Sequence, residues 1–573
     1  MNNVSDTGSS PFSYRTLDEL VEACEKFYHS RVEKSADRPE VHRRREQLAT
    51  WVRKFHKDCG TLSPQVEESI ENLRSRSCVL LMTAHQPNLF AYSGVLRKAT
   101  LNQVLGEKLA ERLKLPVVTF FGLADQDFTD DRWVKSALLP DVERRDGVLE
   151  LHLDLPEKMM LCRVAKPAGK VLDEWRNEIR AWLGRNLRPI EHYCRSVGAK
   201  FEKGDVLTKN FERFWTIVEQ AYPRAAVYSD FNSFTMSKIV NEAWGYPTLF
   251  SRFSECQQIF GDEFRLLISH FEDYSRCLKE AVSSTDGTKG GVYEQEYGTM
   301  PFWYHCECGS KARLMAVEEG GSFFALGKCL RCEKEYRIDF GLKEAPEISG
   351  IMTRISARSL AMPIIFFNGL AVCCYVGGEG GREYLLQAKY VAEHMGATFP
   401  PATIWRPHDI YFGVGQSAAL IAFKDLSSTF DFSQYEFAKS SLEGEVAKIQ
   451  EDIEALELQK KQLGNVRAEK MENIERMRAL SDRQIGIRRR TGYSLMVRNL
   501  KLLANVAEVM RLHPCIVDYA INFGLKGVSD QWKVFLNESR DLSSDTKLKT
   551  DVDDWLRFAQ IESVEADDYG EEI

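Results

Sequence analysis

The sequence has no surplus of basic residues and no long uninterrupted apolar run. Its 76 Lys and Arg residues are outnumbered by 84 Asp and Glu residues, and the formal net charge is -8. General binders of nucleic acid or of anionic membranes need a basic surplus, so both classes are disfavoured. The longest apolar run, residues 360–376, is broken by Pro363, Asn368 and Gly369 and is shorter than the roughly 20 residues of a membrane span. A helix and a strand, or two buried strands, are expected there instead.

The chain also lacks the features of a secreted protein. Its first residues, MNNVSDTGSSPFS, are polar and contain neither the basic nor the apolar region of a signal peptide. The 14 cysteines among 573 residues do not indicate a disulfide scaffold. We therefore expect a cytoplasmic protein. A chain of this length is too long for one core, so roughly two to four structural units are expected.

A strand, a helix and a second strand are predicted between residues 78 and 130. Residues 79–82 form an apolar run of β type, and residues 117–123 form another directly after Pro116. Between the two runs, apolar residues recur at helical spacing. Strands joined by a crossover helix are parallel, and helices cover both faces of a parallel sheet. The sequence therefore predicts an α/β protein with a parallel sheet.

Polar residues follow both of these strands. Ligands bind beyond the carboxyl ends of the strands in open parallel sheets, so the two polar groups predict a ligand site at one sheet edge. Alternatively, His85 caps its loop and Asp127 bonds backbone amides in its own turn. The residues are His85, Gln86 and Asn88 after the first strand and Asp125, Gln126 and Asp127 after the second.

A third buried strand is predicted over residues 370–376, followed by a glycine-rich turn and a helix over residues 382–394. Glycines at such a turn let backbone N–H groups approach an anion at the positive end of the helix. If this strand joins the same sheet, the turn lies at the same edge as His85 and Asp125. The candidate ligand-binding residues are Tyr375, Gly377, Gly378, Glu379, Gly380, Arg382 and Tyr384.

Four cysteines have the spacing of a metal site, with a C-x-C pair, a spacer and a C-x-x-C pair. Four thiolates on two short turns can surround a zinc ion, and such a closed shell indicates a structural role. The spacer predicts a β-hairpin that turns at Gly320 and Gly321. The alternatives are His305 in place of one ligand, or four unrelated core cysteines. The predicted ligands are Cys306, Cys308, Cys329 and Cys332.

The composition changes sharply after residue 432. Apolar residues then recur at alternating spacings of four and three, with Glu and Lys at the outer positions. This pattern predicts a coiled-coil arm over residues 433–512, either a hairpin turning at Gly464 and Asn465 or one continuous helix with a slipped register. Its apolar seam favours self-association, so a homodimer through the coiled coil is expected.

Seven segments follow from these patterns. Within the first, the basic run at residues 43–45 is predicted to be a solvated helix face, with phosphate contact as the alternative. The segments are a disordered start and helical extension (1–77), the first half of the sheet core (78–145), a mixed insertion and linker (146–299), the zinc ribbon (300–341), the second half of the core (342–432), the coiled-coil arm (433–512), and a C-terminal helical segment with an acidic tail (513–573).

Three stretches contain most of these polar and glycine residues: HQPNLF from His85, ADQDF from Ala124, and SARSLAMPIIFFNGLAVCCYVGGEGGREY over residues 356–384. Together they resemble the BshC family, to which the cysteine-adding step of bacillithiol biosynthesis is ascribed. The last stretch follows the family pattern without a gap, and the resemblance extends over residues 78–510. This chain departs from the pattern at His85 and Gln126, where the family has Gln and His, and by its zinc ribbon.

The resemblance implies a Rossmann-like core, similar to that of class I aminoacyl-tRNA synthetases, and a dimerising coiled coil. It also implies a ligase that adds cysteine, or a similar amino acid, to an amine of a sugar-derived acceptor through an activated acyl intermediate. ATP and Mg would serve this chemistry. His85, the glycine turn and Lys98, on the crossover helix, would stabilise a leaving group, and Asp125 and Asp127 would hold a substrate ammonium or Mg. Gln86 and Asn88 complete the implied binding residues.

An alternative function is a noncatalytic or RNA-associated relative of class I synthetase-like folds. In that case the ribbon and the coiled coil would bind the partner, and the altered motif residues would reflect lost catalysis. The ligase hypothesis predicts small-molecule substrates and no membrane or general nucleic-acid partner. Salt-sensitive tRNA binding would discriminate the two.

Overall fold

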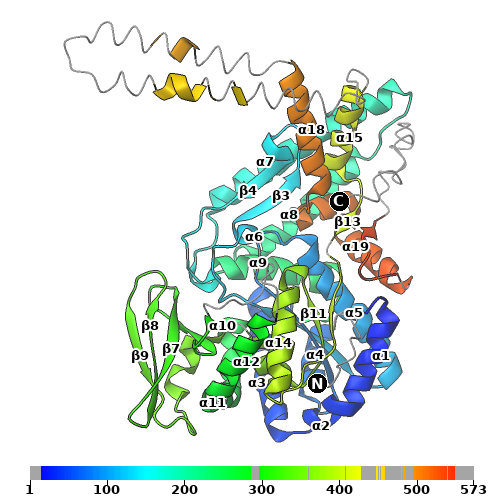
Figure 1. Cartoon of the computed structure of the whole chain (residues 1–573). Helices are drawn as coiled ribbons and strands as arrows, with labels where there is room; N and C mark the ends of the chain where they lie inside the picture. The colour runs from blue at the N-terminus through cyan, green and yellow to red at the C-terminus, as the bar shows by residue number, and fades with distance from the viewer. Residues whose placement is uncertain are drawn as a thin grey trace, which may run out of the picture.

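Figure 1 shows the computed structural model of the chain. It describes residues 14–284, 296–358, 360–406, 408–427, 495–538 and 540–548, with short helical pieces between residues 447 and 484. At its centre is a five-stranded sheet of order β12-β11-β1-β2-β5, in which every neighbouring pair is parallel. The predicted parallel-sheet α/β fold is therefore confirmed. The strands are β1 (Val79–His85), β2 (Val117–Leu123), β5 (Leu249–Arg252), β11 (Val372–Gly377) and β12 (Ala402–Ile404).

Both faces of this sheet are buried. On β1, Val79 and Leu81 pack into one apolar cluster with helices α1 and α5, whereas Leu80 and Met82 pack into a second cluster with α3, α4, α13 and α14. Alternate residues of a strand point to opposite faces, so a strand covered on both sides is apolar throughout. The helices are α1 (Leu17–Phe27), α3 (Pro39–Cys59), α4 (Pro64–Arg74), α5 (Ser93–Leu113), α13 (Ala361–Leu370) and α14 (Arg382–His394).

The predicted strand, helix and strand unit is present as β1, α5 and β2. β1 continues three residues beyond the predicted apolar run, to His85. Residues 360–376 form α13 and β11, so the helix-and-strand interpretation is confirmed, and β11 pairs with β1 in the same sheet. The helix predicted after the glycine turn is α14.

The basic run at residues 43–45 lies on α3, and the prediction of a solvated face is wrong for two of its three residues. Arg43 is exposed and pairs with Asp262, but Arg44 and Arg45 are buried. The Arg45 guanidinium donates hydrogen bonds to the carbonyl oxygens of Leu370, Cys78 and Ala371 at 3.0, 2.9 and 3.3 Å. Arg45 thus satisfies carbonyl groups that precede β1 and β11, at the amino edge of the sheet.

The ribbon is a separate antiparallel sheet of order β10-β6-β7-β8-β9, and it stands out from the core on the left of Figure 1. The predicted hairpin is confirmed, because Glu319 pairs with Ser322 and Gly320 and Gly321 have φ values of 60° and 80°. The fifth strand, β10, comes from beyond the predicted ribbon segment. The strands are β6 (Phe302–His305), β7 (Lys311–Glu319), β8 (Ser322–Cys329), β9 (Glu335–Asp339) and β10 (Ile355–Ala357).

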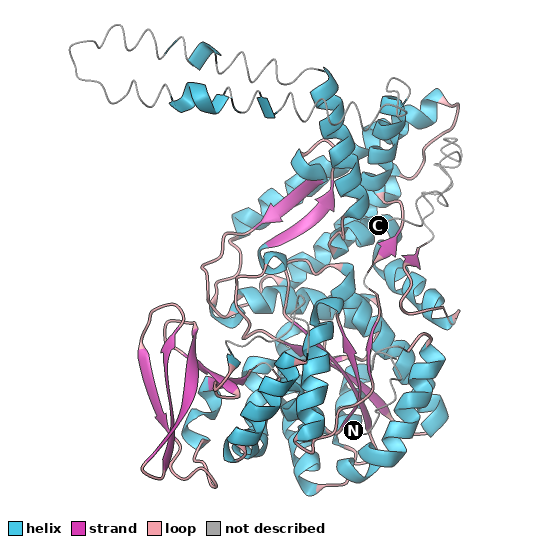
Figure 2. Ribbon diagram, in the orientation of Figure 1, coloured by secondary structure: helices cyan, strands magenta, loops and turns pink. Residues whose placement is uncertain are grey.

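The mixed region after β2 supplies β5 to the core sheet, together with a small hairpin and several helices (Figure 2). Of the later helices, α15 and α18 lie beside that hairpin in the upper part of Figure 1, where α15 also contacts α7, and α19 packs against α8. These elements are β3 (Ser136–Pro140), β4 (Val148–His152), α7 (Gly169–Ser196), α8 (Gly204–Ala221), α9 (Tyr228–Ser237), α10 (Phe253–Cys256), α11 (Gly261–Ser269), α12 (Phe271–Ser283), α15 (Val414–Ser427), α18 (Leu495–Arg511) and α19 (Ile516–Asn537). The short strands β13 (Asp409–Ile410) and β14 (Thr546–Lys547) pair with each other.

Most of the predicted coiled-coil arm, residues 433–512, lies outside the described residues, so the coiled coil and the dimer stay predictions. The same holds for the predicted disordered start, most of the predicted linker and the acidic tail. Across the described parts of the chain, none of the helices is both long and apolar enough to cross a membrane.

Candidate functional site

The carboxyl ends of β1, β2 and β11 lie side by side, because the three strands are parallel neighbours. β1 ends at His85, β2 at Leu123 and β11 at Gly377. The chain adds β2 and β5 on one side of β1 and later adds β11 and β12 on the other. The strand order therefore reverses between β1 and β11, which is the place where ligands bind in open α/β sheets.

Lys98, on α5, lies at this reversal point. Its side chain is 6% exposed, and its Nζ atom donates a hydrogen bond to the carbonyl oxygen of Ala84, 3.3 Å away. Nζ also lies 3.3 Å from the point where a Cβ atom on Gly378 would be. No carboxylate among the described residues pairs with this ammonium, and burial lowers its pKa to about 7. A buried cation with one carbonyl partner, between two strand ends, is suited to bind an anion.

His85 is half-buried beside Lys98. Burial lowers its pKa to about 3, and the neighbouring Lys98 adds to the decrease, so the imidazole is neutral near pH 7. Nδ1 lies 2.9 Å from the carbonyl oxygen of Gln86, which can only accept, so Nδ1 is the donor. The remaining nitrogen, Nε2, is therefore an acceptor in the neutral ring. The Tyr92 ring packs edge-on against the imidazole, with 6.0 Å between ring centroids.

The glycine-rich turn lies on the other side of Lys98. Gly378 follows β11 directly and is half-buried, and α14 begins at Arg382. The side chains of Glu379 and Arg382 are exposed and pair with each other at 3.1 Å. A Cβ atom on Gly380 would meet nothing within 4 Å. Of this predicted group, the structure thus brings the Gly378 backbone to Lys98, whereas the Glu379 and Arg382 side chains contact each other.

Asp125 is fully buried and already has hydrogen-bond partners. Its Oδ1 accepts from the backbone N–H of Ser254 at 2.9 Å, and its Oδ2 accepts from the Ser254 hydroxyl. Burial raises the pKa of Asp125 to about 6, against the effect of these bonds. Because Ser254 is on α10, directly after β5, Asp125 joins the carboxyl ends of β2 and β5. Sequence reasoning missed Ser254, since no local pattern relates it to Asp125.

Asp127 lies beside the ribbon, because the next residue, Phe128, contacts Trp303 and Lys311. Asp127 is half-buried, and burial raises its pKa whereas the nearby Lys311 opposes the rise. Lys311, on β7, is itself 3% exposed, and burial lowers its pKa to about 8. Sequence reasoning missed Lys311 as a site residue, because a lysine in a metal ribbon has no sequence feature that links it to a distant strand end. The structure places it beside that strand end.

Gln86 and Asn88 have different environments in the loop after β1. The Gln86 side-chain amide donates to a carboxylate oxygen of Asp131 at 2.6 Å. Asn88 is 1% exposed, and neither its amide nitrogen nor its amide oxygen has a hydrogen-bond partner. A buried amide without partners is costly, so Asn88 is the residue of this loop whose polar atoms are available to a ligand or an ordered water.

Tyr375 and Tyr384 flank the β11 turn. Tyr375 is buried against Phe367 of α13, with ring centroids 5.1 Å apart. Burial raises the pKa of Tyr384, and the nearby Tyr375, Tyr274 and Asp127 add to the rise. Asp127, after β2, is thus close enough to Tyr384, after β11, to affect its pKa.

The four predicted metal ligands lie together in the ribbon. Their sulfur atoms are all within 4.8 Å of one another, with Cys306 and Cys332 at 3.5 Å and Cys308 and Cys329 at 3.6 Å. Four sulfurs at about 2.3 Å from one metal ion are about 3.8 Å apart in a tetrahedron, so the spacing fits a thiolate shell. His305 does not belong to the cluster. The cluster can hold a metal ion such as zinc, and it leaves no open position for a substrate.

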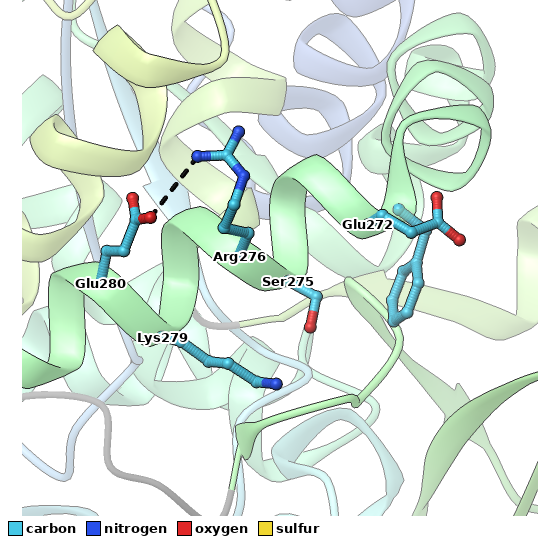
Figure 3. Close-up of a pocket in the computed structure, with 6 residues that line it drawn as sticks. Glu272, Ser275, Arg276, Lys279 and Glu280 are labelled. Carbon is cyan, nitrogen blue, oxygen red and sulfur yellow. Dashed lines mark ion pairs between the residues drawn. The ribbon is translucent and has the colours of Figure 1, made fainter.

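A surface hollow of about 510 Å³ lies away from these residues, along α12 (Figure 3). All of its lining residues come from this one helix, and two of them, Arg276 and Glu280, pair with each other at 3.5 Å. It contains none of the predicted site residues. The lining residues are Phe271, Glu272, Ser275, Arg276, Lys279 and Glu280.

One solved structure is similar to this chain only at low identity. The crystal structure of a putative arginyl-tRNA synthetase from Campylobacter jejuni is 12% identical and covers 82% of this chain and 93% of its own, but the TM-score is 0.19.

Comparison by sequence finds a distant relative. No family model matches the chain. A protein of Prosthecochloris aestuarii (strain DSM 271 / SK 413), described as "Putative cysteine ligase BshC", is 22% identical over 377 residues. The matched region is 62% of this chain, and the chain spans 57% of the length of that relative. The chain is thus distantly similar in sequence to a BshC protein. Its structure combines a parallel α/β core with a four-cysteine ribbon.

Proposed function

We propose that this chain is a ligase that joins the carboxyl group of cysteine, or of a similar amino acid, to an amine of a sugar-derived acceptor. The observation that carries the proposal is the buried ammonium of Lys98 between the ends of β1 and β11. The distant similarity to BshC supports the substrate class. A cation held at this place, without a carboxylate partner, is suited to an anionic co-substrate such as a nucleotide.

The reaction needs activation, because a free carboxylate does not form an amide with an amine under mild conditions. ATP is the proposed co-substrate: a carboxylate oxygen attacks the α-phosphate, and pyrophosphate leaves. The acceptor amine then attacks the acyl carbon, AMP leaves, and the new amide nitrogen loses a proton. Lys98 and the backbone of Gly378 bind the negatively charged pyrophosphate as it leaves, because preformed donors at a buried site stabilise developing negative charge.

His85 acts in this proposal as a neutral hydrogen-bond acceptor for the acceptor amine. Its ring is neutral, and its Nδ1 donates to the Gln86 carbonyl group, so Nε2 can accept a hydrogen bond from the attacking amine. An amine that is held in this way presents its lone pair to the acyl carbon. Both carboxylate oxygens of Asp125 already accept hydrogen bonds from Ser254. Asp127 is therefore the proposed carboxylate that binds a substrate ammonium or Mg.

Zinc is the proposed metal of the ribbon, with Cys306, Cys308, Cys329 and Cys332 as its ligands. The sulfur spacing supports this identity, and a closed shell of four thiolates supports a structural role. The metal therefore takes no part in bond formation in this proposal.

Pyrophosphate exchange tests the reaction on the full-length, metal-loaded protein. Labelled pyrophosphate should enter ATP only when L-cysteine, or a related amino acid, is present. Lys98→Met should abolish exchange, whereas Lys98→Arg should retain part of it because the charge remains. Lys108→Met is the matched control, since Lys108 is on the same helix and pairs with Asp18 at the surface. Absence of exchange with every amino acid tested would contradict adenylate chemistry.

A further inference from the structure

Lys311 is a buried cation that the ribbon places at the edge of the core. Its ammonium lies 4.3 Å from the ring centroid of Phe128 and 5.2 Å from that of Trp303. The structure shows no hydrogen bond or ion pair of this ammonium within the residues that it describes. Aromatic faces stabilise a cation, but they do not neutralise its charge. A lysine that is 3% exposed therefore has an unused capacity to bind an anion.

Asp127 directly precedes Phe128, the residue whose ring lies 4.3 Å from this ammonium. Asp127 and Lys311 each shift the pKa of the other toward the charged form, against burial, so they are electrostatic neighbours. They do not form an ion pair. Neighbouring positive and negative groups that are not paired with each other match a ligand that carries both charges, because each charge of the ligand can then meet its opposite.

We propose that Lys311 and Asp127 form the two halves of a binding site for an α-amino acid, with Lys311 on its carboxylate and Asp127 on its ammonium. The inference rests on the proposed function, in which an amino acid is a substrate, and it adds the residues that recognise it. It also gives the ribbon a role, since one of its strands supplies half of the site.

The backbone shows how the metal cluster positions Lys311. The turn after Cys308 contacts the core through Gly309, whose carbonyl oxygen accepts from the N–H of Met160 at 2.9 Å. The next two residues, Leu161 and Cys162, donate from their backbone N–H groups to the carbonyl oxygens of Asp127 and Asp125 at 3.0 and 2.9 Å.

The segment at residues 159–163 thus lies between the turn after Cys308 and the loop after β2 that contains Asp125 and Asp127. Gly309 has a φ of 88°, and a Cβ atom there would be 2.9 Å from the Met159 methyl group and 3.2 Å from the Arg163 Cβ. This close approach leaves little freedom for the ribbon to move. The fit depends on the shape of the turn after Cys308, which the four-cysteine cluster holds, so loss of the metal should distort this turn and displace Lys311 from Asp127.

Binding of three probes by calorimetry tests the site on the full-length, zinc-loaded protein without nucleotide. L-Cysteine carries both charges, cysteamine lacks the carboxylate, and 3-mercaptopropionate lacks the ammonium. The wild-type protein should bind L-cysteine more tightly than either fragment. Lys311→Met should weaken L-cysteine and 3-mercaptopropionate about ten- to hundredfold and leave cysteamine unchanged, because only a carboxylate contacts Lys311. Asp127→Asn should weaken L-cysteine and cysteamine and leave 3-mercaptopropionate unchanged.

Two controls separate recognition from damage to the fold. Lys328→Met removes an exposed lysine of the same ribbon, which pairs with Glu335, and it should change none of the three affinities. L-Serine, ethanolamine and 3-hydroxypropionate repeat the comparison without a thiol, so metal chelation by the probe cannot produce the pattern. Metal-free protein should behave like Lys311→Met.

The proposal is overturned if Lys311→Met weakens all three probes equally, if the fragments bind as tightly as L-cysteine, or if L-cysteine does not bind. It is also overturned if metal removal leaves L-cysteine affinity unchanged. Failure of the ligase proposal looks different, because the three-probe pattern would then hold while pyrophosphate exchange is absent.

Discussion

The ammonium of Lys98 lies against the backbone of Gly378, so that a Cβ atom on this glycine would be 3.3 Å from Nζ. Gly378→Ala should therefore move the ammonium by a few tenths of an ångström and weaken the binding of ATP, about tenfold if one charged hydrogen bond is lost. Equilibrium binding of ATP measures the effect. Gly350→Ala is the control, because a Cβ atom there meets nothing within 4 Å. Equal affinities of the two variants would contradict an anion site at Gly378.

The binding of pyrophosphate should depend on pH through Lys98. Its pKa of about 7 in the free protein means that the ammonium loses its proton as the pH rises above this value. An anion binds the protonated form, so affinity should be greatest below about pH 7 and fall above it, with proton uptake on binding. Calorimetry in two buffers of different ionisation enthalpy measures that uptake. Lys98→Arg should abolish the pH dependence, and an unchanged pH profile in this variant would assign it to another group.

Removal of the metal should destabilise the ribbon and spare the core. The purified protein is expected to contain one zinc ion per chain, and Cys308→Ser should lose it, because three thiolates and water hold zinc less tightly than four thiolates. Elemental analysis and limited proteolysis at the ribbon measure the two effects. Cys194→Ser, in α7, is the control and should retain the metal. Full metal content in Cys308→Ser would remove Cys308 from the ligand set.

Arg45→Met should lower the thermal stability of the core. The substitution leaves three buried carbonyl groups without the guanidinium that binds them, and hydrogen bonds to a charged group contribute about 1.5 to 3 kcal/mol each. The melting temperature, followed by circular dichroism, should fall by several degrees. Arg43→Met should have little effect, since its ion pair with Asp262 is exposed. Similar melting temperatures for both variants would argue against a structural role of Arg45.

The protein should not bind tRNA in a salt-sensitive way. The net charge of -8 leaves no general surplus for phosphate contacts, and the cations of the site, Lys98 and Lys311, are too buried to add to an exposed basic surface. Gel shifts at low and high salt check this expectation. A complex that forms at low salt and dissociates at high salt would favour the RNA-associated alternative over the ligase.

The parts of the fold that are predictable from sequence are those with a local pattern. The apolar runs of β1, β2 and β11 are buried on both faces, and the spacing of the four cysteines is a local feature of two turns. β5 was not predictable in the same way. It has only four residues, LFSR, and only its pairing with β2 identifies it as part of the sheet.

The site shows the same division. His85 ends β1, Gly378 follows β11, and Lys98 is on the helix that connects β1 to β2. These positions meet at one sheet edge because the strands are parallel, and this topology can be inferred from the sequence. The partners of the two aspartates cannot be inferred in that way. Ser254 and Lys311 come from distant segments, and tertiary packing alone brings them to Asp125 and Asp127.

The position of β1 in the sheet has a consequence for how the protein is made. β1 is central, and its neighbour β2 follows soon after it along the chain, but its other neighbour, β11, begins only at Val372. At about 5 to 20 residues per second, a ribosome takes roughly 15 to 60 seconds to complete the intervening chain. During that time one side of β1 has unpaired backbone groups beside apolar side chains, which is a site for aggregation. The newly made first half should therefore depend on a chaperone until β11 emerges.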